Sequence, residues 1–287
     1  MAEEKVNAGK RQHSVWVWAI PAVLIALAGI VAFGLLRPRE APAPQKGIGD
    51  PVPASIMEAV AQVPPETWTK AGSKDVRSLQ AVPPTSAGAA DKPIVLYVGA
   101  EFCPYCASQR WALVAALSRF GTFSGLTLSA SSSTDSYPNT STFSFHGSSF
   151  ASEYVEFQSV ELQGREEQGG KYPSLQTPTP DQLVLYRKYN APPYTQSAGS
   201  IPFVLIGQRL MWAGTSVPPV VLEKKDWETV AAGLKNGETQ EARYIIANAN
   251  MLTAAICAQN GGRPADVCQN PGVLEAAKLL PTPAPGG

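Results

Sequence analysis

The longest hydrophobic pattern in the chain is an uncharged run of 22 residues, from position 15 to position 36. As a helix rising about 1.5 Å per residue it would be about 33 Å long, close to the ~30 Å hydrocarbon core of a bilayer. Trp16 and Trp18 lie at one end, where indole rings favour the headgroup level. We therefore predict a transmembrane anchor over 15–36. The alternative is a cleaved signal peptide, whose apolar region is usually shorter, at about 7–15 residues.

The segments around this run lack apolar periodicity. Residues 1–14 are expected to be a short tail on one side of the membrane. Residues 37–51 are rich in proline and alanine, which predicts a semi-rigid linker. The globular domain is expected over 52–280, followed by a disordered tail at 281–287.

Within the domain, continuous apolar runs typical of buried strands alternate with patterns typical of helices. The run 94–98 is continuously apolar and β-branched, as in a strand buried on both faces. A helical pattern follows over 104–120, and a second buried strand is predicted at 200–206. Gly207 and Gln208 fit a two-residue hairpin turn, after which 209–212 would form the returning strand. This order predicts an α/β fold.

The part of the domain between these two units is long. Residues 121–200 contain a Ser/Thr-rich stretch, a candidate strand at 154–162 and a candidate helix at 181–189. We expect most of this span to be an insertion between the first helix and the second strand unit. The helical periods return over about 226–280, which we expect to be a helical C-terminal part.

Composition narrows the possible functions. Lys and Arg total 23, and Asp and Glu also total 23, so no net charge is available to attract nucleic acid. The two histidines, His13 and His146, are too few for a polyhistidine metal site. We therefore expect no nucleic acid partner, no metal and no cofactor.

The strongest chemical signal is a Cys-x-x-Cys motif, formed by Cys103 and Cys106 where a predicted strand turns into a helix. The N–H groups and dipole at a helix N-terminus stabilise a thiolate, so Cys103 is expected to be the nucleophile. Cys106 lies one turn later on the same face, where it can resolve a mixed disulfide. Pro104 suits the first turn of a helix. The motif thus predicts thiol–disulfide exchange.

Other interpretations of the motif are weaker. A disulfide within one helical turn restrains little chain, so it would add little stability. A zinc site would need a second closely spaced pair, but Cys257 and Cys268 have ten residues between them. Glu101, which precedes the motif, is expected to be solvated. Arg110, seven residues after Cys103, is also expected to be solvated; the alternative is that it raises the positive potential near the motif.

The stretch VLYVGAEFCPYC resembles the active-site entry of the thioredoxin-like superfamily, and SIPFVLIGQRLMWAG resembles its cis-proline strand and hairpin. The resemblance implies a thioredoxin-like fold in which Pro202 is a cis-proline packed against the motif. Pro104, Tyr105 and Ile201 would then contact an extended substrate peptide. The alternative is that Pro202 simply begins a strand.

A narrower resemblance involves CPYCASQRWALVAALSRFGTFSGL and YPNTSTFSFHG. These stretches are similar to a family of membrane-anchored, thioredoxin-like proteins, domain of unknown function 929. The resemblance brings no established activity with it.

The second cysteine pair bears on the cellular location. We expect Cys257 and Cys268 to form a structural disulfide across a turn; an electron relay to the first pair is the alternative. Positive charges are equal in number on the two sides of the predicted anchor. Because disulfides persist in oxidising compartments, we place the domain outside the cytoplasm and residues 1–14 inside it, in a single-pass protein of the cell membrane.

The leading hypothesis is a membrane-anchored, extracytoplasmic thiol–disulfide oxidoreductase. Its partners would be protein clients with thiols or disulfides, a redox protein that recycles the site, and membrane lipid around residues 15–36. The alternative is an anchored, non-catalytic binding or assembly module that uses 121–200 to hold a partner. A metal-delivery protein is a third possibility.

Overall fold

The computed structural model describes residues 46–74, 76–84 and 92–281. The predicted anchor at 15–36, the tail before it, the linker up to residue 45 and residues 282–287 lie outside this part of the chain. Among the described residues, no helix is both long and apolar enough to cross a bilayer.

The central sheet has five strands of mixed direction, and the Cys-x-x-Cys motif follows its strand β2. The strands follow the order β1-β9-β8-β2-β7. β2 is parallel to β7 and antiparallel to β8, while β9 pairs antiparallel with both β8 and β1. The strands are β1 (Gln80–Ala81), β2 (Ile94–Gly99), β7 (Glu156–Glu161), β8 (Phe203–Ile206) and β9 (Leu210–Ala213).

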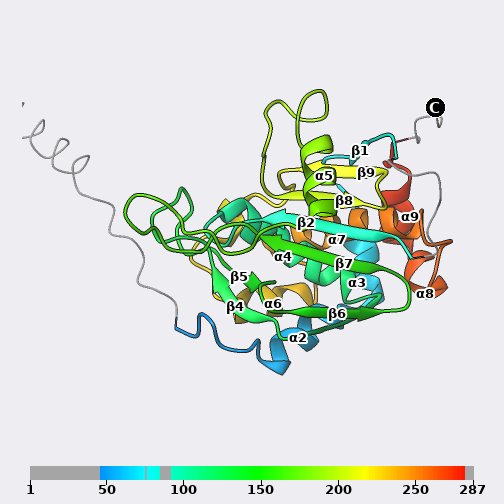
Figure 1. Ribbon diagram of the computed structural model, residues 1–287. Helices are drawn as coiled ribbons and strands as arrows, with labels where there is room; N and C mark the ends of the chain where they lie inside the picture. The colour runs from blue at the N-terminus through cyan, green and yellow to red at the C-terminus, as the bar shows by residue number, and fades with distance from the viewer. Residues whose placement is uncertain (1–45, 75, 85–91, 282–287) are drawn as a thin grey trace, which may run out of the picture. The chain divides into compact units, whose positions relative to one another are not determined.

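Helices cover both faces of this sheet (Figure 1). Val95 and Tyr97 of β2 belong to the core shared with α4 (Pro104–Leu117) and α7 (Gln240–Cys257). Leu96 and Val98 point to the opposite face, whose core includes Tyr189 of α5 (Pro180–Tyr189). The continuous apolar run in β2 follows from this burial on both sides.

The remaining helices pack around α4 and α7. The C-terminal part of the domain is helical, and α7 packs against both α4 and α9. These elements are α2 (Ala54–Ala61), α3 (Pro65–Ala71), the 3-10 helix η1 (Pro219–Leu222), α6 (Trp227–Leu234), α8 (Ala265–Cys268) and α9 (Pro271–Ala277).

The expected insertion at 121–200 is only partly an insertion. Its strand β7 pairs with β2 inside the central sheet, and α5 covers one face of that sheet. Two separate two-stranded sheets lie in the first half of the span. They pair β3 (Gly121–Ser124) with β6 (Ser149–Ser152), and β4 (Thr127–Ala130) with β5 (Ser141–Ser144).

Two local predictions were wrong. The turn between β8 and β9 contains three residues, because Ile206 pairs with Leu210; Gly207 and Gln208 both have positive φ angles. The end of the expected linker is attached to the domain: Gly49 N donates to the carbonyl of Leu128 at 2.8 Å. Residues 49–52 thus extend the β4 edge by backbone hydrogen bonding, which the composition of this stretch does not show.

Candidate redox site

The Cys-x-x-Cys motif lies where α4 begins. Cys103 is the N-cap of this helix, and its Sγ accepts a hydrogen bond from the backbone N–H of Cys106 at 3.2 Å. Pro104 follows at the first helical position, where its missing N–H leaves no hydrogen bond unmade. Both cysteines are free thiols; Cys103 is 5 % exposed and Cys106 is fully buried.

The pKa values of the two thiols are shifted in opposite directions. Hydrogen bonding from the Cys106 side chain lowers the pKa of Cys103, and the Cys106 amide and the charge of Arg110 act in the same direction against burial. Burial raises the pKa of Cys106 well above its ordinary value. The structure therefore favours Cys103 as the thiolate and Cys106 as the protonated partner.

The predicted peptide-contacting residues lie beside the thiols. The Ile201–Pro202 peptide bond is cis, and the half-buried Ile201 packs against the apolar cluster that contains Cys103 and Cys106. Pro202 is buried just before β8, and its carbonyl accepts from Gly214 N at 2.7 Å. Tyr105 is 44 % exposed. The structure thus brings the two segments of the resemblance together at one place.

Aromatic rings from the 121–200 span lie against the motif. Phe102 stacks on Tyr172, with ring centroids 4.0 Å apart, and Tyr105 meets Tyr137 edge-on at 6.1 Å. Since Tyr137 and Tyr172 come from loops of this span, the span forms part of the surface around the thiols.

A buried ion pair lies beneath the thiols. The Arg110 side chain, which we had expected to be solvated, is 0 % exposed, and so is its partner Glu161 on β7. Arg110 Nε donates to Glu161 Oε1 at 2.9 Å, and Nη2 donates to Oε2 at 2.7 Å. Burial raises the pKa of Glu161 to about 7. The expectation for Arg110 was wrong because nearly the whole of α4 is buried, so its arginine must find a partner inside.

Glu101 was also expected to be solvated, and it is 5 % exposed. Its carboxylate accepts hydrogen bonds from the hydroxyls of Ser129 and Ser144, each at 2.6 Å. These serines lie on β4 and β5 of the Ser/Thr-rich stretch. Two of the serines in that stretch are therefore explained by the buried carboxylate of Glu101, to which their hydroxyls donate.

Comparison with known proteins shows the family of the chain. The sequence model of a domain of unknown function (DUF929) matches residues 80–258, more than half of the 287 residues. The chain belongs to this family. Both thiols of the motif and the Ile201–Pro202 segment lie inside the matched region. No curated protein and no solved structure matches the chain.

The second cysteine pair of this DUF929 protein is joined. Cys257 at the end of α7 and Cys268 in α8 form a disulfide, as predicted, with Cα atoms 5.7 Å apart. Within residues 46–74, 76–84 and 92–281, no group of three or more His, Cys, Asp or Glu side chains is placed to hold a metal ion.

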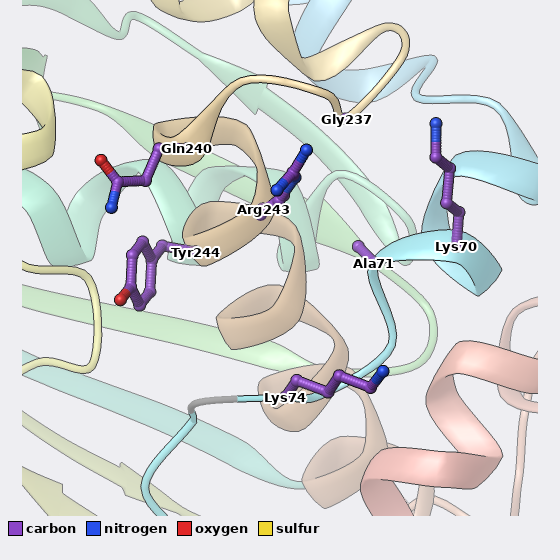
Figure 2. A pocket seen from close by; sticks show the side chains of 7 residues that line it. All are labelled: Lys70, Ala71, Lys74, Gly237, Gln240, Arg243 and Tyr244. Atoms are coloured by element: carbon purple, nitrogen blue, oxygen red, sulfur yellow. The ribbon is translucent and has the colours of Figure 1, made fainter.

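A separate surface pocket has a volume of about 430 Å³ (Figure 2). One side of it is formed by α3 and the segment that follows this helix, and the other side by the start of α7. It is lined by three cationic side chains and by polar and small residues, namely Lys70, Ala71, Lys74, Gly237, Gln240, Arg243 and Tyr244. Lys70 forms an ion pair with Glu238 at 3.1 Å. None of the lining residues belongs to the thiol site, so the pocket is not part of it.

Proposed function

We propose that this DUF929 protein is a thiol–disulfide oxidoreductase with a thioredoxin-like fold. The observation that carries the proposal is the hydrogen bond from Cys106 N to Cys103 Sγ, at the start of a helix and beside the cis Ile201–Pro202 bond. A sulfur that accepts N–H groups at a helix N-terminus is stabilised as a thiolate, and the thiolate is the reactive form in disulfide exchange.

The topology supports the fold assignment. The parallel strands β2 and β7 are connected through α4, and the antiparallel hairpin β8–β9 is followed by α6 and α7. In the first unit, β2–α4–β7, the Cys-x-x-Cys motif lies between the end of β2 and the start of α4. In the second unit, the cis-proline directly precedes β8. Both units lie in one sheet, so the two signature segments of the resemblance meet at the end of β2 where α4 begins.

The proposed exchange has two steps. The Cys103 thiolate attacks one sulfur of a client disulfide: a Cys103–client bond forms, the client S–S bond breaks, and the departing thiolate takes up a proton. Cys106 then loses its proton and attacks Cys103 Sγ, which forms the Cys103–Cys106 disulfide and releases the second client thiolate. Two electrons have passed to the client. The same steps in reverse oxidise a client dithiol.

Clients would bind as extended peptides across the thiols. Ile201 borders the sulfurs and would offer main-chain groups to such a peptide, as in β-strand addition. The exposed ring of Tyr105 would contact the client next to Cys103, whereas the side chain of Pro104, for which the resemblance implied the same contact, is buried at the start of α4. Apolar clients are therefore expected to be the better substrates.

Two features support a location at the cell membrane with the domain outside the cytoplasm: the apolar run 15–36 and the Cys257–Cys268 disulfide. The run 15–36 would anchor the protein in the cell membrane with its N-terminus in the cytoplasm, as its sequence predicts. The Cys257–Cys268 disulfide supports an oxidising compartment for the domain. Clients and the recycling protein would then share that compartment.

A trapping experiment tests the activity. Cys106→Ser retains a hydroxyl that can donate to Cys103 but cannot resolve a mixed disulfide, so the full-length variant should accumulate mixed disulfides with clients. The matched control is Cys103→Ser, a substitution of the same size that lacks the nucleophile, and it should accumulate none. Non-reducing electrophoresis followed by reduction measures both.

Two results would contradict the proposal. Equal trapping by the two variants would show that Cys103 is not the nucleophile. A partner that co-purifies without a covalent bond when both thiols are replaced by serine, in the absence of any trapped client, would favour the binding module instead.

A further inference from the structure

Arg110 lies on the same face of α4 as the two thiols. The positions 103, 106 and 110 are related by steps of three and four residues, which place side chains on one stripe of a helix. Arg110 Nη2 donates to the carbonyl of Ala100 at 2.8 Å, and Ala100 packs in the same cluster as Cys103 and Cys106. The guanidinium is therefore tied to a residue that packs against both thiols.

Of the two charges in the ion pair, Arg110 acts more strongly on the thiols. Glu161 reaches Arg110 from β7, the edge strand next to β2. Both charges affect the pKa of Cys106, and the lowering by Arg110 is larger than the raising by Glu161. Arg110 also lowers the pKa of Cys103. The thiols thus experience mainly the positive end of the pair.

Other titratable groups around the thiols do not replace this cation. Glu101, which precedes the motif, accepts hydrogen bonds from two serine hydroxyls. Burial raises the pKa values of Tyr97 on β2 and Tyr186 on α5, so both phenols stay neutral at physiological pH. Arg110 therefore supplies the positive charge next to Cys103 from inside the domain.

We propose that the Arg110–Glu161 pair sets the redox direction of the site: Arg110 stabilises the Cys103 thiolate, and with it the reduced form, so that the Cys103–Cys106 disulfide oxidises client dithiols. This inference rests on the proposed function. Stabilising the thiolate makes a disulfide more oxidising, because the reduced product becomes more favourable. Glu161 opposes this effect and limits it.

The reaction balances with the client dithiol as reductant. A client thiolate attacks the Cys103–Cys106 bond, a mixed disulfide forms, and the second client thiolate displaces Cys103. The client gains one disulfide and loses two electrons and two protons. Cys106 takes one proton; Cys103 remains a thiolate beside Arg110, and the other proton goes to solvent.

Two variants of the full-length protein test the effect of each charge of the pair. Arg110→Met removes the cation; the pH profile of Cys103 alkylation should move about one unit toward alkaline pH, and the equilibrium constant against glutathione should shift about tenfold toward the protein disulfide, which corresponds to about 30 mV. Glu161→Gln leaves Arg110 unopposed and should shift both quantities in the opposite direction. A merely structural role would move both variants the same way.

Two further variants make the test robust. Arg119→Met removes a half-buried arginine just beyond the end of α4, about 20 Å along the helix direction from the motif, and should leave both quantities unchanged. Arg110→Met/Glu161→Leu replaces the whole pair by apolar groups, so it retains a filled core if a single variant fails to fold. It should shift both quantities in the same direction as Arg110→Met but by less, because the opposing charge of Glu161 is removed as well.

The outcomes separate the two proposals. Unchanged profiles in Arg110→Met or in the double variant, or shifts of the same sign in both single variants, would overturn the role of Arg110. If the profiles shift as expected but Cys106→Ser traps no client, the proposed function fails while the effect of Arg110 on Cys103 stands.

Discussion

Breaking the Arg110–Glu161 pair should cost far more stability than replacing it. Both side chains are 0 % exposed, and the pair is held by two hydrogen bonds of 2.7 and 2.9 Å. Removing one partner of a buried ion pair typically costs about 3–5 kcal/mol, because the other charge is left without compensation. Arg110→Met and Glu161→Leu should each lower the free energy of unfolding by about that amount. The double variant should lie within about 2 kcal/mol of the wild type, since apolar groups of similar volume fill the site.

The two single variants should also differ in their pH dependence. Without Arg110, burial alone acts on Glu161 and holds its pKa at or above the value of about 7 that it has beside the arginine. A carboxyl whose pKa is raised in the folded state contributes stability at low pH, and this stability is lost as the pH rises through the folded pKa. Arg110→Met should therefore lose less stability at pH 5 than at pH 8. Glu161→Leu leaves a permanent cation, so its loss should be nearly constant over this range.

Urea unfolding of the full-length protein in detergent, followed by tryptophan fluorescence, measures these free energies at pH 5 and pH 8. The coupling energy of the double-mutant cycle should be several kcal/mol at pH 8. Additive losses, with the double variant as unstable as the two single losses combined, would refute the reasoning. They would mean that each charge is stabilised by its own contacts, such as the bond from Arg110 to the carbonyl of Ala100.

Three further predictions concern other parts of the domain. Replacing Cys257 and Cys268 by alanine opens a loop with a sequence separation of 11 residues and should lower the free energy of unfolding by about 3 kcal/mol, measured by urea titration with a reduced wild type as control. Gly99→Ala would place a methyl group 2.0 Å from the Tyr97 hydroxyl and should cost about 1–3 kcal/mol; an unchanged melting temperature would contradict the contact. The pKa of the Cys103 thiol is lowered from its ordinary value of 9.0, so alkylation of Cys103 should persist as the pH falls below 9.0. A pH profile of alkylation with its midpoint at 9.0 would contradict this.

The sequence predicted the elements whose signals are local. The run in β2 is apolar at every position because both faces of that strand are covered, and the helix begins at Pro104 because the motif and the proline define an N-terminus. The structural disulfide was also predicted, since its two cysteines are close in sequence. The turn after β8 was wrong by one residue, because Gly207 alone does not fix which residues pair across the hairpin.

Interactions between distant segments could not be predicted in this way. Glu101 is buried because hydroxyls from two strands, 28 and 43 residues later, donate to it, and a Ser-rich stretch indicates only polarity. Glu161 lies 51 residues from Arg110, at the end of a strand whose pairing with β2 was not predicted. A sequence pattern identifies the charged residue but not its partner in space.

One signal could nevertheless have shown that Arg110 is buried rather than solvated. The residues around it on α4 are almost all apolar, and a helix that is apolar on nearly every face must be buried. An arginine within such a helix cannot reach water and must be paired inside the protein. Its spacing of seven residues from Cys103 places the charge below the motif, because seven residues correspond to about two helical turns. For any Cys-x-x-Cys helix with this composition, a charged residue at this spacing should therefore be treated as part of the thiol environment.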